Sequence, residues 1–101
     1  MAGNRRFYVR RSAEAEIAGA FDWYRGKRPG LELEFLTDVD RAFAEIRDAP
    51  ERWPTWRPDR PYRRHLLRRF PFVVFYRVTN SYVRVVAVAH MSKRPGYWLR
   101  K

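Results

Sequence analysis

The sequence predicts an α+β fold. An N-terminal strand and a two-helix hairpin are followed by a three-strand antiparallel meander. The strands form one twisted sheet with the helices on one face, and a short C-terminal tail or helix ends the chain. Apolar residues recur at helical spacing in the first half, and strand-like runs rich in β-branched and aromatic residues fill the second half. With 101 residues, the chain has the size of one domain with one core, so we expect a single domain over residues 1–101.

The first part of the chain predicts a strand and then a helix. Residues 6–11 have the pattern of a short strand with Phe7 and Val9 on one face. Ser12 is expected to cap the helix that follows, and Gly26 with the basic pair after it is expected to end it. The apolar face of this helix is predicted to comprise Ala13, Ile17, Ala20, Phe21 and Tyr24.

A second helix is predicted after a short turn that contains glycine and proline. Pro29 suits its first turn, and Ala49-Pro50 is expected to stop it. Its apolar stripe comprises Phe35, Leu36, Val39, Ala42, Phe43 and Ile46. The proline-rich loop after this helix carries Trp53 and Trp56, and we expect it to be ordered because aromatic side chains rarely stay free in water.

The meander is predicted from three strand-like runs at 62–69, 72–79 and 82–90. A two-residue turn at Asn80-Ser81 would place Arg77 opposite Arg84. In this register the face under the helices carries Phe72, Val74, Tyr76, Val78, Val83, Val85, Ala87 and Ala89. The opposite face is expected to carry Val73, Phe75, Arg77, Arg84, Val86, Val88 and His90.

The net charge lies entirely in the second half of the chain. The formal net charge is +11; residues 60–101 hold eleven basic and no acidic residues, whereas residues 1–59 hold eleven of each. This asymmetry indicates a basic face with an anionic partner, either nucleic acid or an acidic protein segment. The alternative is that the basic residues only keep the protein soluble. We expect no membrane partner, because the basic half does not have the pattern of an amphipathic helix.

The predicted open face of the sheet is both cationic and apolar. Arg77 opposite Arg84 would cost about a few tenths to one kcal/mol, and an anionic partner would relieve this repulsion. Alternatively, both guanidinium groups extend into solvent, where their charges are screened. An exposed apolar strip on the same face would need a protein cover, and it is predicted to comprise Val73, Phe75, Val86 and Val88.

The sequence offers one kind of catalytic chemistry. It has no cysteine, and neither histidine has a carboxylate nearby in sequence, so we expect no metal and no cofactor. RNA cleavage through the 2′-hydroxyl needs only cations for the phosphate and a His, Lys or Tyr to move a proton. The candidates are Arg63, Arg64, His90, Lys93, Arg94 and Tyr97. His90 is equally explained as a surface residue that bonds the tail. Trp98 is either a stacking platform or a ring that folds back over the sheet.

Several short segments occur in order over residues 6–98: Phe21-Asp22-Trp23-Tyr24, Pro29-Gly30-Leu31, Phe35-Leu36, Ile46, Ala49-Pro50, Arg63-Arg64, Leu67-Arg68-Arg69-Phe70-Pro71-Phe72, Tyr76-Arg77-Val78, Ala87-Val88-Ala89-His90, Lys93-Arg94-Pro95 and Tyr97-Trp98. As a set they resemble the RelE/ParE superfamily of type II toxins, more closely its ParE-like branch. The resemblance implies a cytoplasmic bacterial toxin that inhibits growth and that a cognate antitoxin silences within a hetero-oligomer.

Two activities divide this superfamily. RelE-like members cleave mRNA on the ribosome with basic residues and a terminal Tyr or His, whereas ParE-like members bind DNA gyrase. Tyr97 lies where a RelE-like tyrosine would be, but the RelE-like spacing places Met91 at the expected arginine, with Lys93 the nearest basic residue. We therefore expect a gyrase-binding protein without enzymatic activity. A ribosome-dependent mRNA endonuclease and a basic nucleic-acid-binding module remain the alternatives. The residues expected to contact the antitoxin or the target are Val73, Phe75, Arg77, Arg84, Val86, Val88 and Trp98.

Overall fold

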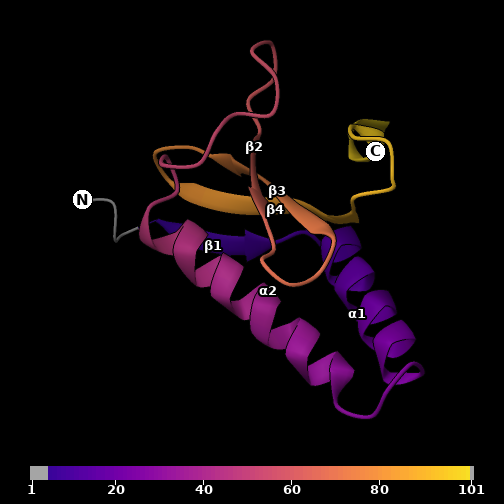
Figure 1. Cartoon of the computed structure of the whole chain (residues 1–101). Helices are drawn as coiled ribbons and strands as arrows, with labels where there is room; N and C mark the ends of the chain where they lie inside the picture. The colour runs from indigo at the N-terminus through magenta and orange to yellow at the C-terminus, as the bar shows by residue number, and fades with distance from the viewer. Residues whose placement is uncertain (1–4, 101) are drawn as a thin grey trace.

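The structure, a computed structural model, describes residues 5–100, and its elements follow the predicted order (Figure 1). Along the chain they are β1 (Arg6–Val9), α1 (Arg11–Arg25), α2 (Leu31–Asp48), β2 (Arg63–Leu66), β3 (Phe72–Val78), β4 (Tyr82–His90) and the 3₁₀ helix η2 (Tyr97–Arg100). This arrangement confirms the predicted α+β class, the helical hairpin and the three-strand meander.

The four strands form one mixed sheet in the order β1-β4-β3-β2. β1 runs parallel to β4, while β3 is antiparallel to both β2 and β4. The two helices lie against one face of the sheet, and the loop before β2 and the C-terminal segment lie on the other side (Figure 1). The first strand therefore becomes an edge strand beside the last one, although most of the chain separates them.

The main core lies between the helices and the sheet. Amphipathic helices bury their apolar stripe there because this removes about 25 cal/mol per Å² of apolar surface from water. Its buried residues are Ala13, Tyr24, Phe35, Val39, Ala42, Ile46, Leu67, Phe70, Phe72, Val74, Tyr76, Val83, Val85 and Val88. The rings of Tyr24, Phe35 and Phe70 contact one another with centroids 4.8–5.5 Å apart, mostly edge to face.

The helix ends differ from prediction at their N-termini. α1 begins at Arg11, so Ser12 lies inside the helix, and Arg10 precedes it without a side-chain cap. α2 is preceded by Gly30 at φ 91°, a left-handed conformation that favours glycine, and Pro29 lies in the turn before it. Both C-terminal predictions are confirmed, because the helices end directly before Gly26 and Ala49. Within residues 5–100, neither helix is long and apolar enough to cross a membrane.

The β3–β4 hairpin has the predicted turn but a different register beyond it. Arg77 pairs with Arg84 as predicted. Further from the turn, Tyr76 pairs with Val85 but Phe75 pairs with Ala87. Val86 is therefore an extra residue of β4 without a partner on β3, which makes a β-bulge. One extra residue reverses the side-chain alternation of everything after it, because side chains on a strand alternate between faces.

This bulge moves the last residues of β4 to the opposite face from the one predicted. Val88 belongs to the core under the helices, whereas Ala87 and Ala89 pack in a cluster on the open face. His90 lies with its ring 5.2 Å from that of Phe72, beside α1 and not on the open face. The prediction therefore assigned the wrong face of the sheet to Ala87, Val88, Ala89 and His90.

A second apolar cluster lies on the open face of the sheet. It comprises Phe75, Val86, Ala87, Ala89 and Trp98, with Trp56, Tyr62, Val73 and Tyr97 packed against it. Phe75 is only 4% exposed and Val86 only 2%. The expected exposed apolar strip is thus covered by the chain itself, through η2 and the loop before β2.

Candidate functional site

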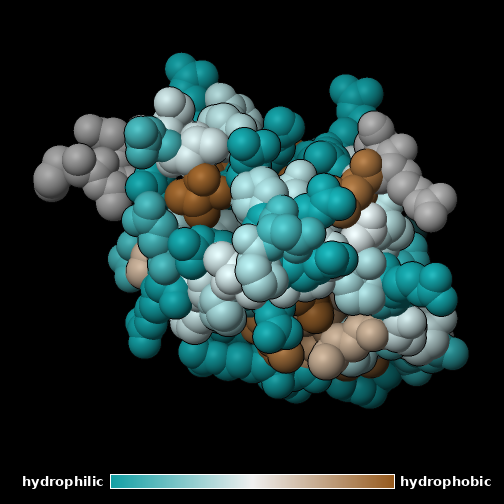
Figure 2. All heavy atoms as spheres, turned by 90° about the horizontal axis from the view of Figure 1, so that it is seen from above, coloured by the Kyte–Doolittle hydropathy of each residue, from teal (hydrophilic) through white to brown (hydrophobic). Residues whose placement is uncertain are grey.

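Next to the covered cluster, the open face carries a group of arginine and tyrosine side chains, which we call the Arg–Tyr surface. Its members are Arg6, Tyr8, Arg10, Arg77, Tyr82 and Arg84. Because Phe7 and Val9 pack into the core, their neighbours Tyr8 and Arg10 point to the opposite side of the sheet. Seen from above in Figure 2, this face is mainly hydrophilic, with a few separate hydrophobic areas.

Strand pairing brings these residues together. Arg6 pairs with Tyr82, and Tyr8 pairs with Arg84, in the parallel β1–β4 ladder. The rings of Tyr8 and Tyr82 are 6.1 Å apart, and the Arg84 guanidinium lies 5.8 Å from the Tyr82 ring. Tyr8, Arg10, Tyr82 and Arg84 line an open hollow of about 330 Å³.

The arginines of this surface have no acidic partner in the described part of the chain. Among residues 5–100, no ion pair involves Arg6, Arg10, Arg77 or Arg84. Several acids pair with arginines elsewhere, as Glu51 does with Arg5. The surface therefore carries positive charge that no ion pair within the described residues compensates.

The C-terminal segment is held on the open face by three contacts. The Trp98 ring lies 4.2 Å from that of Phe75 and is 3% exposed, so of the two alternatives expected for this ring, the one in which it folds back over the sheet is found. Arg10 donates to the Trp98 carbonyl oxygen over 3.3 Å. The Tyr97 hydroxyl donates to one oxygen of Glu16, whose other oxygen accepts the Val88 amide over 2.9 Å. Burial, together with the Glu16 carboxylate, raises the pKa of Tyr97 well above its usual value.

Of the predicted catalytic residues, Lys93 and Arg94 lie close to Tyr97 in the C-terminal segment. His90 contacts Ser92 through Nδ1 at 2.8 Å, and the Lys93 ammonium lies 4.5 Å from the Tyr97 ring. Arg94 and Tyr97 line a shallow hollow with the residues between them.

Arg63 and Arg64 lie on β2 and serve a different region. Arg63 donates to the carbonyl oxygens of Glu51 and Trp53, so it anchors the loop before β2. Arg64 is exposed, and within residues 5–100 no hydrogen bond or ion pair joins either side chain to the C-terminal candidates. Among residues 5–100, Arg63 and Arg64 therefore have no bond to the proton-transfer candidates of the C-terminal segment.

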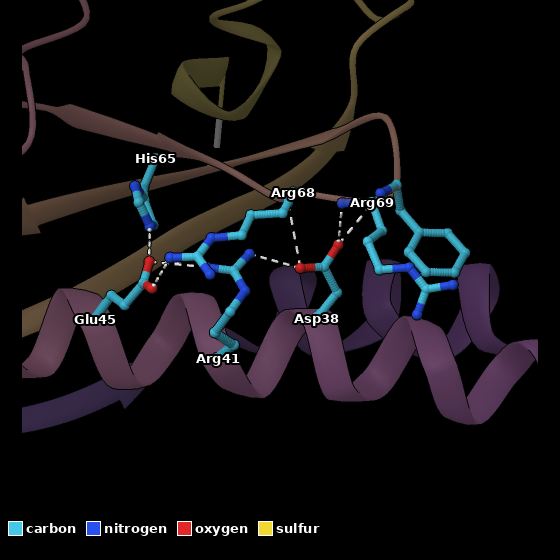
Figure 3. A network of polar contacts seen from close by, with 7 residues as sticks. Asp38, Arg41, Glu45, His65, Arg68 and Arg69 are labelled. Atoms are coloured by element: carbon cyan, nitrogen blue, oxygen red, sulfur yellow. Dashed lines mark hydrogen bonds and ion pairs between the residues drawn. The ribbon is translucent and has the colours of Figure 1, made fainter.

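A polar network that the sequence reasoning missed links α2 to the sheet (Figure 3). Asp38 is 4% exposed, and its carboxylate accepts the backbone amides of Arg68, Arg69 and Phe70 at 2.7–3.2 Å. Burial alone would raise the pKa of Asp38, but the hydrogen bonds from Arg41 and from these amides outweigh it and lower the pKa. The available signal was that Asp38 falls on the apolar stripe of its helix.

Glu45 is the second carboxylate of this network. It contacts His65 Nε2 at 2.8 Å and forms ion pairs with Arg41 and Arg68 (Figure 3). The hydrogen bond from His65 and the two arginines lower the pKa of Glu45. Arg69 pairs with Glu34. The positive charges of Arg68 and Arg69 are thus compensated by nearby carboxylates, unlike those of the Arg–Tyr surface.

Comparison with known proteins agrees with the fold described above. The family model described as ParE toxin of type II toxin–antitoxin system, parDE, matches residues 7–95. A solved structure titled chromosomal ParDE TA system from P. aeruginosa superposes with a TM-score of 0.78 at 16% sequence identity. That match covers 89% of this chain and 99% of the other. No curated protein matches the sequence significantly.

Proposed function

Because the chain belongs to the ParE toxin family of type II toxin–antitoxin systems, we propose that it inhibits bacterial growth by binding DNA gyrase in the cytoplasm. We further propose that a cognate antitoxin neutralises it within a hetero-oligomer. The antitoxin would be expected to present acidic residues to the Arg–Tyr surface, since charge complementarity gives partner specificity and fast association.

One observation favours inhibition by binding over RNA cleavage. The Tyr97 hydroxyl is engaged by Glu16, and its pKa is raised, so it does not readily release a proton to a substrate. The cations of the Arg–Tyr surface lie on or next to β1, β3 and β4, and within residues 5–100 none of them bonds to the Tyr97 side chain. A surface of cations that form no ion pair within residues 5–100 supports binding of an anionic or acidic partner.

The first test is induction of the protein alone, followed by measurement of both DNA supercoiling and transcript integrity. Gyrase binding predicts a loss of negative supercoiling with intact transcripts. Cleaved transcripts with normal supercoiling would contradict the proposal and support the endonuclease instead.

Replacement of Tyr97 by Phe tests the same proposal at a single atom. We expect Tyr97→Phe to retain full growth inhibition, because binding needs no proton transfer. The lost hydrogen bond to Glu16 costs about 1.5–3 kcal/mol of stability, so the amount of folded protein must be measured beside the growth arrest. A folded Tyr97→Phe protein that no longer arrests growth would show that the hydroxyl takes part in chemistry.

The paired arginines of β3 and β4 are proposed to contact the antitoxin or the target. The double replacement Arg77→Ala/Arg84→Ala is expected to weaken antitoxin binding about tenfold or more at low salt, with little change in stability, because both side chains are exposed. Calorimetry with the product of the neighbouring reading frame would measure this. The matched control Arg25→Ala/Lys27→Ala removes equal charge from the C-terminal end of α1 and the turn after it, and should bind as the parent does. Equal loss in both double variants would mean that only total charge matters.

A further inference from the structure

We propose that the Arg–Tyr surface binds single-stranded nucleic acid directly. This goes beyond the proposed function, because it requires neither gyrase nor an antitoxin. Cations that neutralise phosphates and aromatic rings on which bases stack are the two features that single-strand binding needs. Both occur here within one patch of the sheet.

The first step in the argument is the alternation of residue types. Across the β1–β4 ladder, arginine faces tyrosine in both pairs, Arg6 with Tyr82 and Tyr8 with Arg84. Along each strand the same two types alternate two residues apart, a separation of about 6.6 Å. Among these four residues, each tyrosine ring therefore has a guanidinium group beside it, and each guanidinium group has a tyrosine ring beside it.

The second step is that the rings are accessible and not part of the core. Tyr8 is 44% exposed, and the core cluster under the helices contains neither it nor Tyr82. The hollow between them is open to solvent and includes the Arg10 and Arg84 side chains. A base can enter this hollow and stack while its phosphate contacts a guanidinium group.

The third step distinguishes nucleic acid from an acidic peptide. A carboxylate-rich segment needs the cations but gains little from exposed tyrosine faces. Bases gain from both, since stacking on an aromatic side chain contributes about 1–3 kcal/mol per base and tolerates any sequence. A duplex is disfavoured because its bases are stacked on each other and cannot reach rings that lie on a sheet face.

The experiment is fluorescence anisotropy of a labelled oligothymidylate of about 12 nucleotides, within the length that comparable single-strand sites cover, titrated with the full-length protein. Three or four neutralised phosphates predict a slope of about −2 to −3 in log K against log salt, at about 0.7 per phosphate. Arg84→Ala should lower the steepness of this slope by about 0.7. A duplex of the same length should bind more weakly.

The tyrosine variants separate stacking from charge. Tyr82→Leu keeps an apolar side chain on the strand and should lower affinity about 5- to 150-fold, which corresponds to the loss of one stacked base. Tyr8→Leu should behave alike, and circular dichroism verifies that each variant is folded. Lys27→Ala removes one charge at the turn between the helices and should bind within about twofold of the parent.

Three results would overturn the proposal. One is the absence of binding at about 0.1 M salt, and another is tighter binding of duplex than of single strand. The third is binding that both tyrosine variants retain and that polyglutamate displaces as well as unlabelled oligothymidylate does, which would identify an acidic protein as the ligand. None of these results depends on growth inhibition or gyrase, so failure of the proposed function would be recognised separately.

Discussion

Replacement of Asp38 by Ala is expected to lower the free energy of unfolding by about 3–5 kcal/mol, a large fraction of the stability of a domain of this size. The Asp38 carboxylate accepts three backbone amides of the turn between β2 and β3 and pairs with Arg41. Its removal leaves buried amides without an acceptor and Arg41 without one of its two acidic partners. Urea unfolding followed by circular dichroism would measure the loss.

Two variants serve as controls for this prediction. Asp40→Ala removes an exposed carboxylate two residues away on the same helix and should change stability by no more than about 0.5 kcal/mol. Asp38→Asn keeps one acceptor oxygen but loses the charge, so we expect an intermediate loss of about 1.5–3 kcal/mol. Equal stability of Asp38→Ala and Asp40→Ala would mean that the turn does not depend on this carboxylate.

The same carboxylate makes stability depend on pH. An unfolded Asp has a pKa of about 3.9, and the folded pKa of Asp38 is lower. The contribution of Asp38 is therefore fully present above about pH 4 and is lost as the pH falls through its folded pKa. Below about pH 4 the parent should lose stability more steeply than Asp38→Asn, because the other carboxylates, Glu45 included, titrate in both proteins.

The fold could be predicted because its elements depend on local periodicity. The stripe on α2 repeats at helical spacing and leads to a buried face with Phe35, Val39 and Ile46. The hairpin turn could be predicted because two residues, Asn80 and Ser81, separate two apolar runs. These signals lie within a few residues of each other in the sequence, so one sequence is enough to read them.

The bulge in β4 could not be predicted, because nothing in the neighbouring sequence marks it and the contact that Val88 makes after it involves a distant residue. After the bulge, the Val88 amide donates to the Glu16 carboxylate, and 72 positions separate the two residues. No local pattern marks Val86 as the extra residue, since an uninterrupted apolar run fits both faces equally well. For this reason the prediction for Val88 failed while the Arg77–Arg84 pair, on the near side of the bulge, was confirmed.

The candidate site was only half visible in the sequence for a similar reason. Arg77 and Arg84 were identified from the hairpin, but Tyr8 and Arg10 were not connected with them. Their inclusion depends on the parallel pairing of β1 with β4, a contact between the two ends of the chain. The alternation in residues 6–11 showed that these side chains leave the core, but it could not show which strand they would lie beside.

Replacement of Trp98 by Ala is expected to lower the free energy of unfolding by about 2–4 kcal/mol and to expose the apolar cluster on the open face. The Trp98 ring packs on Phe75 and lies 5.1 Å from the ring of Trp56. The expected loss is below that of the most costly tryptophan deletions because the buried Trp98 Nε1 has no hydrogen-bond partner among residues 5–100. Urea unfolding and binding of a hydrophobic dye such as ANS would measure both effects.

Two neighbouring changes make this prediction specific. Trp98→Phe keeps an aromatic ring on Phe75 and removes the unpaired N–H, so its stability should be close to that of the parent. Leu99→Ala alters a more exposed side chain in the same 3₁₀ helix and should bind little dye. If Trp98→Ala were as stable as Leu99→Ala and bound no more dye, the C-terminal segment would not cover the sheet in solution. Phe75 and Val86 would then be free for a protein partner, as the sequence predicted, and the apolar half of this face would join the Arg–Tyr surface in binding the antitoxin or the target.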